Sequence, residues 1–381
     1  MNQGTSLRLL LGVGLFCALS PARIQAVDLD IHGDVTTLIG WQKTDKDALN
    51  IGQGPRGLLG DQLADINNNP NEENLGIFLD QVEIDMGKQL GASFGWRFDL
   101  DVSPHRDNTG DGDNNDNRDG IDLEQAYIEG SPFFYKHYDP AKGGFKLAAG
   151  RFNAHVGYDP IDRKNLNTIS FSSIHRFLLP HNISGGKATL FKERWSGETF
   201  VVQGIQNQDL NEKTISPSYG VNLKRDGWKQ KSWLQLSGIA GPQEEAKGKW
   251  TYLADLAARW NLSSTSQFGL EGVYRIEKNG VCGNGKEDCV YYGGMIQFVQ
   301  TLTDQLSGTL RSGYLRDQDN GGLTGASQTI WDGTVALSYS FMEVAKFVLE
   351  YRQDVQIPTG SIANRENAVV FGAGGLFVYE F

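Results

Sequence analysis

The chain ends in residues 367–381, which read N-A-V-V-F-G-A-G-G-L-F-V-Y-E-F. Phe371, Phe377, Tyr379 and Phe381 share one parity within this stretch. A two-residue period places side chains on one face of a β-strand. A closed barrel pairs its last strand with its first and so leaves no open edge. The stretch therefore predicts the closing strand of a transmembrane β-barrel, with the C-terminal strand of a soluble sandwich as the alternative.

The composition of the 381-residue chain agrees with a barrel. Hydrophobic residues make up 39%, mean hydropathy is −0.39, and there are 47 glycines but 11 prolines. A helical membrane protein needs runs of about 20 apolar residues, and the mature chain has none. A transmembrane barrel instead interleaves lipid-facing and lumen-facing residues, so its mean hydropathy resembles that of a soluble protein. A secreted β protein would fit the same composition.

The N-terminus predicts export. Arg8 precedes an apolar run over residues 9–19, and Ile24-Gln25-Ala26 fits a signal-peptidase site. We expect a signal peptide at 1–26 and one transmembrane barrel domain at 27–381. Cleavage would remove Arg8 and Arg23 and change the formal charge from −11 to −13. Such an acidic protein is not expected to bind nucleic acid.

Alternation of polar and apolar residues recurs along the whole mature chain. In residues 250–260, one parity carries Trp250, Tyr252, Leu256 and Trp260, whereas Asp255 lies on the other. This pattern predicts an antiparallel all-β barrel of about 16 strands with aromatic residues at the membrane interfaces. Long polar connections, expected to be extracellular, lie near 44–73, 103–120, 153–182, 207–216, 241–249, 278–289, 317–328 and 357–366. Short turns, expected to be periplasmic, lie between them.

Two cysteines remain in the mature part, Cys282 and Cys289, separated by six residues in a glycine-rich, charged loop. In an exported protein this spacing predicts a small disulfide at a loop tip. A metal site would need further cysteine or histidine residues nearby, and we expect none.

The long connection at 153–182 differs from the other loops because it is rich in apolar residues. They are Ile161, Ile169, Phe171, Ile174, Phe177, Leu178 and Leu179. Exposed surface loops seldom carry so many large apolar side chains. We expect this loop to fold into the barrel, pack on the inner wall and constrict the lumen. A loop across the barrel mouth or in a subunit contact is the alternative.

The same region carries a family resemblance. The motifs at 150–152 (G-R-F), 156–159 (V-G-Y-D) and 161–162 (I-D), with the Phe/Leu/Pro-rich run before His181, resemble the OmpL-like β-barrel porins. Phosphate-selective porins are similar in pattern, but the lysine-rich ladder that such a pore would need is missing. The resemblance implies an outer-membrane channel for passive diffusion of small hydrophilic solutes. A non-conducting structural or adhesive barrel is the alternative.

Strand parity and the 153–182 loop together select the candidate pore residues. We expect the pore or its constriction to be lined by Arg97, Asp99, Asp101, Arg151, Asp159, Asp162, Arg163, Lys164, Arg176, Arg259, Arg311 and Arg352. Acidic side chains outnumber basic ones on the lumen-facing parity of the clearest strands. Basic residues of the loop oppose this excess, so we expect a modest preference for cations. The expected partners are outer-membrane lipid, the barrel assembly machinery (through the strand ending in Phe381), small solutes and, in a homotrimer, two further copies.

Signals for other functions are weak. Residues 107–120 resemble a calcium loop, but the twelfth position counted from Asn115 is Ala126, where a bidentate glutamate is needed. Residues 91–95 fit G-x-S-x-G, yet they begin a strand instead of forming a strand–turn–helix elbow. The six histidines show no metal-binding spacing. We therefore expect neither enzymatic activity nor a cofactor.

Overall fold

The computed structural model describes residues 30–44, 73–90, 94–103, 120–131, 143–204, 217–227, 232–242, 250–278, 288–318, 328–359 and 368–381. Residues Ile31–Phe381 form one compact unit, which contains the barrel. Four predictions fall outside the described residues. They concern the signal peptide, the G-x-S motif at 91–93, nearly all of the calcium-like loop, and Cys282.

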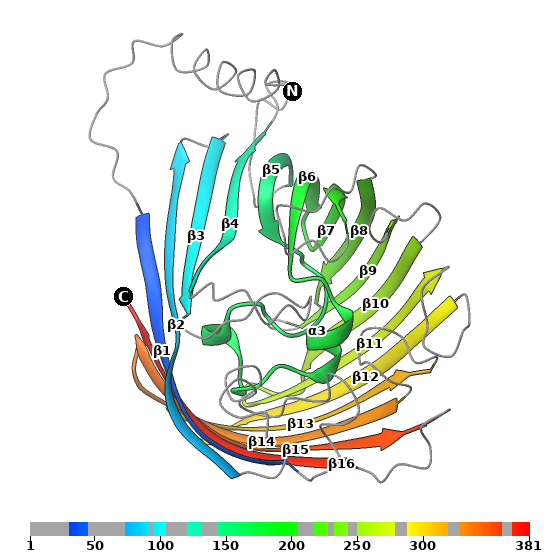
Figure 1. Cartoon of the computed structure of the whole chain (residues 1–381). Coiled ribbons are helices and arrows are strands. Elements are labelled where there is room, and N and C mark those ends of the chain that lie inside the picture. Colours follow the sequence, from blue (N-terminus) through cyan, green and yellow to red (C-terminus); the bar gives the residue numbers. More distant parts are fainter. Residues whose placement is uncertain are drawn as a thin grey trace, which may run out of the picture. The chain divides into compact units, whose positions relative to one another are not determined.

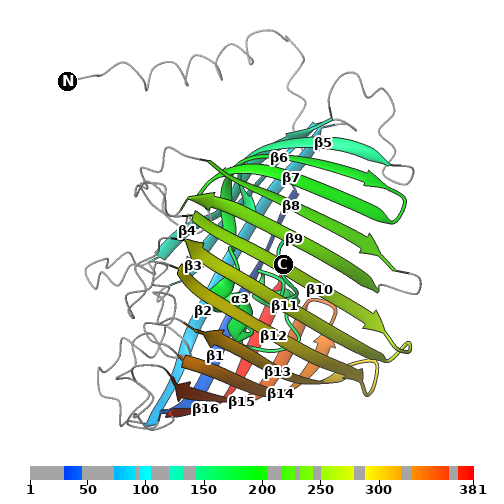
Figure 2. The same ribbon diagram turned by 90° about the vertical axis from the view of Figure 1, so that its right-hand side faces the viewer.

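Sixteen strands lie within the described residues and form one closed antiparallel barrel (Figure 1). In Figure 2 they run obliquely across the wall. The sequence-based prediction of fold and strand number is therefore confirmed. The strands are β1 Asp30–Thr44, β2 Glu73–Leu90, β3 Phe94–Ser103, β4 Gly120–Gly130, β5 Gly144–Asn153, β6 Asn182–Lys192, β7 Trp195–Gln203, β8 Pro217–Asp226, β9 Trp233–Pro242, β10 Trp250–Asn261, β11 Ser266–Lys278, β12 Asp288–Thr301, β13 Leu306–Asp317, β14 Gln328–Met342, β15 Ala345–Pro358 and β16 Ala368–Glu380.

The last strand closes the barrel against the first. Strands β1 and β16 pair from Asp34 opposite Glu380 to Thr44 opposite Val370. Beyond this ladder, the Gly33 amide donates to the Phe381 carbonyl at 3.1 Å, and the Phe381 amide donates to Gly33 at 3.0 Å. A Cβ at position 33 would lie 2.6 Å from the Phe381 ring. Because Gly33 has no side chain, the Phe381 ring can pack where β1 and β16 meet.

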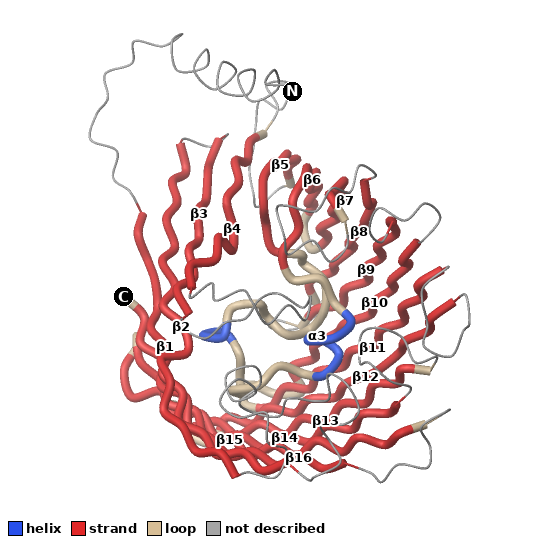
Figure 3. Tube along the Cα trace, in the orientation of Figure 1, coloured by secondary structure: helices blue, strands red, loops and turns tan. Residues whose placement is uncertain are grey.

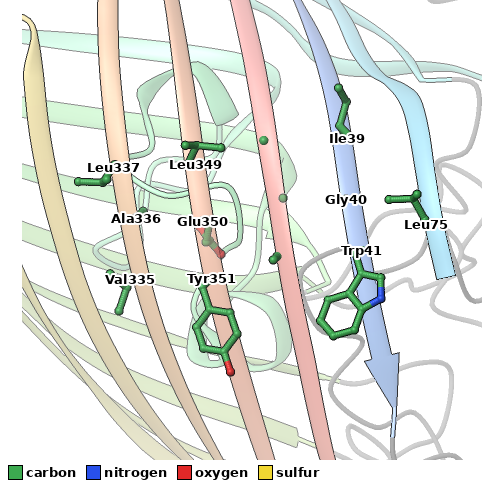
Figure 4. Close-up of a pocket in the computed structure, with 13 residues that line it drawn as sticks. Ile39, Gly40, Trp41, Leu75, Val335, Ala336, Leu337, Leu349, Glu350 and Tyr351 are labelled. Atoms are coloured by element: carbon green, nitrogen blue, oxygen red, sulfur yellow. The ribbon is translucent and has the colours of Figure 1, made fainter. Parts of the chain in front are cut away.

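Alternation separates the two faces of each strand. On β15, Leu349 and Tyr351 are 50% and 45% exposed on the outer surface, whereas Glu350 between them is buried on the inner side (Figure 4). An apolar groove of about 480 Å³ lies on the outer wall, and Figure 4 shows residues that line it. The groove follows β16, where the small residues 373–375 lie between larger side chains of β1 and β15. Apolar side chains outside and polar ones inside are typical of a barrel in lipid.

Connection lengths follow the predicted alternation only in part, because the β4–β5 connection at 131–143, expected to be a short turn, is longer than the β9–β10 connection at 243–249. The tightest described turns are 193–194 and 343–344, followed by 262–265 and 302–305. Strand β2 extends beyond the apolar alternation of Val82, Ile84 and Met86. Strand β2 continues to Leu90 because Gly87 still pairs with Arg97 in the ladder to β3. Glycine destabilises the interior of a strand, but the hydrogen bonds to the neighbouring strand can continue past it.

Helical structure within the described residues is confined to two short elements between β5 and β6. They are η2 (Arg163–Asn165) and α3 (Ser173–Leu178), which Figure 3 shows within the ring of strands. Ser172 caps α3 by accepting a hydrogen bond from the His175 amide at 3.2 Å. No helix in the described part of the chain is long and apolar enough to cross a membrane.

Candidate functional site

The connection between β5 and β6, residues 154–181, lies inside the barrel (Figures 1 and 3), and we call it the inner segment. Its two ends meet where it leaves the wall. The Ala154 amide donates to the His181 carbonyl at 2.6 Å, and the Asn182 side chain donates to Asn153 at 2.7 Å. The segment therefore starts and returns at neighbouring positions, and its middle reaches across the lumen.

Apolar packing attaches one side of the segment to the wall. Ile174 and Leu178 of α3 are fully buried. Their cluster also contains wall residues that point inward, namely Ile183, Phe200, Val202, Ile239, Leu253, Val273, Tyr291, Met295, Leu315 and Ile330. A second cluster places Ile169 against Leu38, Ala336, Val348, Leu376 and Val378. The inner face of a water-filled barrel is normally polar, so this apolar strip is matched to the segment that covers it.

Charged wall residues bind the backbone of the segment. Glu350 on β15 accepts hydrogen bonds from the amides of Ile169 (2.5 Å) and Ser170 (3.3 Å). Arg352 donates to the Phe171 carbonyl at 2.5 Å. Arg311 on β13 donates to the Ser170 carbonyl at 2.8 Å. Buried backbone groups that lack water need such partners, so these side chains replace the hydrogen bonds of regular secondary structure.

Acidic residues complete this buried network. Asp332 accepts a hydrogen bond from the Ser173 amide at 3.3 Å, and Asp159 accepts one from Ser172 at 2.9 Å. Asp354 pairs with Arg352 at 2.8 Å. Arg311 and Arg352, both expected to line the pore, are 3% and 5% exposed because the segment covers them. Their positive charges are thus shared among neighbouring carboxylates and backbone carbonyls.

The first residues of the segment cross β8 to β11. The His155 carbonyl accepts hydrogen bonds from Asn222 and from Gln235 (2.9 Å). Glu271 accepts the Tyr158 amide at 3.0 Å. Between them, Gly157 adopts a φ of 96°, and a Cβ there would lie 2.3 Å from the Leu179 side chain. Glycine is required at this bend because it alone readily adopts positive φ without a clash.

The tip of the segment, residues 160–167, reaches β1 and β2. Lys164 lies 3.1 Å from Asp34, 3.4 Å from Glu83 and 3.1 Å from Asp85. Burial is the largest influence on Asp162 and raises the pKa of its carboxyl, while Lys164 and Arg97 lower it. The Arg163 side chain lies outside the described part of the structure.

The wall from β2 to β7 carries further charge pairs, of which Arg97–Asp85 and Lys146–Glu129 are the more accessible. The pairs are Arg97–Asp85 at 3.4 Å, Lys146–Glu129 at 2.7 Å and Lys187–Glu198 at 3.5 Å. The Arg97 side chain is 39% exposed although it points into the barrel. Lys146, Glu129, Lys187 and Glu198 were missed as candidates, but their inward parity on β4 to β7 could have identified them.

The remaining candidates are spread around the inner wall. Asp99 and Asp101 are buried, bound to Arg97 (2.6 Å) and Gln81 (2.7 Å) respectively. Arg151 is buried and donates to a backbone carbonyl of β4. Two further arginines are half-buried against aromatic rings: Arg259 over Trp233 and Arg176 over Phe177. The candidates do not form one ring of charge.

His175 is a buried titratable side chain of the inner segment. Its ring lies between those of Phe171 (4.7 Å) and His181 (4.6 Å). Burial, with smaller contributions from His181 and Arg311, lowers the pKa of His175 well below its ordinary 6.5. The undocked segment therefore binds a proton more readily than the docked one. We therefore expect His175 to disfavour docking increasingly as the pH falls below 6.5.

We expect the inner segment to leave the wall more often at pH 5 than at pH 7.5, which current recordings from single barrels in a planar bilayer would show as transient drops. His175→Phe keeps the stacking with Phe171 and His181 but cannot take up a proton. Part of the acid effect should therefore disappear in this variant. An acid response identical in both proteins would show that His175 is not the group responsible.

Comparisons with known proteins agree with this architecture. The sequence profile of the family described as "Putative beta-barrel porin-2, OmpL-like" matches residues 28–377. No curated protein sequence matches the chain.

Several solved structures share the fold. The outer membrane channel DcaP of Acinetobacter baumannii superposes with a TM-score of 0.64 at 11% identity, covering 93% of this chain and 97% of that one. The anion-selective porin from Comamonas acidovorans gives 0.60 at 9% identity, with coverages of 93% and 99%. A trimer form of OmpT, an outer membrane protein of Vibrio cholerae, gives 0.57 at 10% identity, with coverages of 93% and 99%. At these identities the likeness establishes the fold alone.

Proposed function

Because the chain belongs to this OmpL-like β-barrel porin family, we propose that it forms a water-filled channel for passive diffusion of small hydrophilic solutes and ions. The observation that supports this most directly is the 39% exposure of Arg97 at an inward-facing position. The inner segment is attached to β7–β16, to β1 through Ile169, and to β1 and β2 through its tip. Solutes would pass between the segment and the charged wall formed by β3 to β6.

Planar-bilayer recording of the folded mature protein tests this function. A diffusion channel opens in stable current steps, whereas a structural or adhesive barrel does not. Protein unfolded by heating serves as the control, because the channel depends on the closed barrel. A folded preparation that inserts but carries no current would support the non-conducting alternative.

Ion selectivity should be weak because the accessible charges occur as pairs of opposite sign. We keep the expectation of a modest cation preference, which should decrease with salt because screening lengths fall to about 8 Å at physiological ionic strength. Arg97→Glu should increase cation preference, measured as the reversal potential in a KCl gradient. Arg176→Glu and Arg163→Glu should act in the same direction.

Lys278→Glu is a suitable control for these charge reversals. Lys278 pairs with Asp288 at 2.5 Å, and its side chain is 46% exposed on the outward parity of β11. Its reversal should therefore leave the reversal potential almost unchanged. An anion-selective wild-type channel would contradict the predicted sign.

We also propose that the apolar outer surface contacts outer-membrane lipid and that the chain is exported with cleavage after Ala26. A homotrimer is a further proposal, supported by the trimer form of the similar OmpT structure. The Cys282–Cys289 disulfide stays a prediction, and mass spectrometry of protein from the oxidising envelope would test it. Two free thiols would contradict it.

A further inference from the structure

The tip of the inner segment is held against β1 and β2 by the ammonium group of Lys164. Its nitrogen lies within 3.4 Å of carboxylate oxygens from three residues, Asp34 on β1 and Glu83 and Asp85 on β2. Asp34 and Glu83 are each 1% exposed. Three strand carboxylates therefore converge on one side chain of the segment. In a site so shielded from water, each attraction is stronger than at an open surface.

The surroundings of Lys164 carry an excess of acid. Oxygens of Glu83, Glu124 and Asp162 all lie within 4.8 Å of one another. Burial alone would lower the pKa of Lys164, but Glu83, Asp34 and Asp85 raise it above its ordinary value. The lysine thus remains charged throughout the physiological range. Removing Lys164 would leave these buried carboxylates without their central cation. Such an uncompensated buried charge costs a large amount of free energy.

The tip differs from the rest of the segment in how it is attached. The dense network of Arg311, Glu350 and Arg352 engages residues 168–173 and does not extend to the tip. Within the tip, the Lys164 and Leu166 carbonyls accept hydrogen bonds from Lys346 on β15. Among the described side chains of the tip, Lys164 makes the ion pairs to β1 and β2. A tip that lost these ion pairs would keep only the Lys346 hydrogen bonds among these attachments, and it could move only toward the lumen, because the wall blocks the other direction.

We propose that Lys164 is a positioning residue that latches the tip of the inner segment to β1 and β2 and thereby keeps the channel steadily open. This inference rests on the proposed channel function. The sequence had suggested Lys164 as a charge that selects ions. In the latch, its charge is instead paired with the acidic side chains of Asp34, Glu83 and Asp85, and its loss acts mainly on the motion of the tip.

Two variants separate the latch from the effect of charge. Lys164→Met removes a positive charge, and the triple variant Asp34→Asn, Glu83→Gln, Asp85→Asn removes negative ones. Both break the latch. In single-channel recordings, both should show several-fold more transient closures than the wild type. Their reversal potentials should move in opposite directions, toward cations for Lys164→Met and toward anions for the triple variant.

Lys146→Met provides the matched control. Lys146 pairs with Glu129 at 2.7 Å on the open wall, between strands β5 and β4. Its loss should alter selectivity without increasing transient closures. Heat-dependent gel migration shows whether the barrel of each variant is closed. A closed barrel stays folded in detergent at room temperature and migrates differently after heating. A variant that fails this check is replaced by Lys164→Gln or by the single change Glu83→Gln.

A second readout does not require conductance. Leu166 is 4% exposed, so a small thiol reagent should reach Leu166→Cys slowly, with Cys282 and Cys289 changed to serine. Adding Lys164→Met should accelerate the reaction several-fold, and Lys146→Met should not. Unchanged labelling and unchanged closures in the latch variants would overturn the latch. A wild type that does not conduct would instead contradict the channel function, and the labelling rates would still decide whether the latch exists.

Discussion

Replacing Arg352 by alanine is expected to release the middle of the inner segment while the barrel stays closed. Arg352 pairs with Asp354 at 2.8 Å and donates to the Phe171 carbonyl at 2.5 Å, and it is 5% exposed. Without the guanidinium, a buried carboxylate and a buried carbonyl lose their partner. Removing one member of a buried ion pair typically costs about 3–5 kcal/mol. This penalty falls on docking of the segment, because the strand ladders of β15 do not depend on the side chain.

The labelling rate of the Leu166→Cys reporter measures this release, and gel migration of unheated protein measures barrel closure. The reporter should react much faster in Arg352→Ala, with closure unchanged. Arg316→Ala is the matched control, because Arg316 donates to Thr329 at 2.6 Å without contacting the segment. Adding Asp354→Ala to Arg352→Ala should recover part of the docking, since the unpaired carboxylate is then also gone. Labelling as slow as in the wild type would mean that Arg352 does not hold the segment.

The strands were predictable from sequence because their signal is local. A residue in a barrel strand faces either lipid or the interior, and the two environments select opposite side chains at successive positions. Trp250, Tyr252 and Leu256 on the outside of β10, with Asp255 inside, are sufficient to define that strand. The parity of Phe377 and Tyr379 likewise predicted the outer face of β16, and pairing with β1 followed from the need to remove sheet edges.

The candidate site was predictable only in part, because parity gives the face of a residue but not what covers it. Arg311 and Arg352 point inward as expected, yet the inner segment buries them. The partners in that contact, Arg352 and Phe171, are 181 residues apart, and no local pattern encodes such a distance. One signal was available. Met295 and Leu315 are apolar at inward-facing positions, which marks a wall that must be covered.

Deleting Phe381 is expected to reduce the amount of folded barrel in the outer membrane to a small fraction of the wild type. The deletion removes two backbone hydrogen bonds, from Phe381 to Gly33 and from Gly33 to Phe381. It also removes the ring that Gly33 accommodates at the seam between β1 and β16. An incompletely paired seam leaves edge strands that can bind other chains. Asp304→Asn, in the exposed turn 302–305, serves as the control and should accumulate normally.

Further substitutions at the same position distinguish assembly from stability. Phe381→Tyr keeps the backbone pairs and the ring, so it should accumulate nearly as well as the wild type. Phe381→Asp keeps the backbone pairs but places a charge at the outer surface, where the Phe381 ring is 52% exposed. Near the membrane interface, such a charge costs only about 0–1 kcal/mol. A strong loss in Phe381→Asp would therefore come from failed recognition of the terminal strand during assembly. Equal outer-membrane amounts of Phe381→Asp and Asp304→Asn would show that the terminal aromatic residue is not needed for assembly.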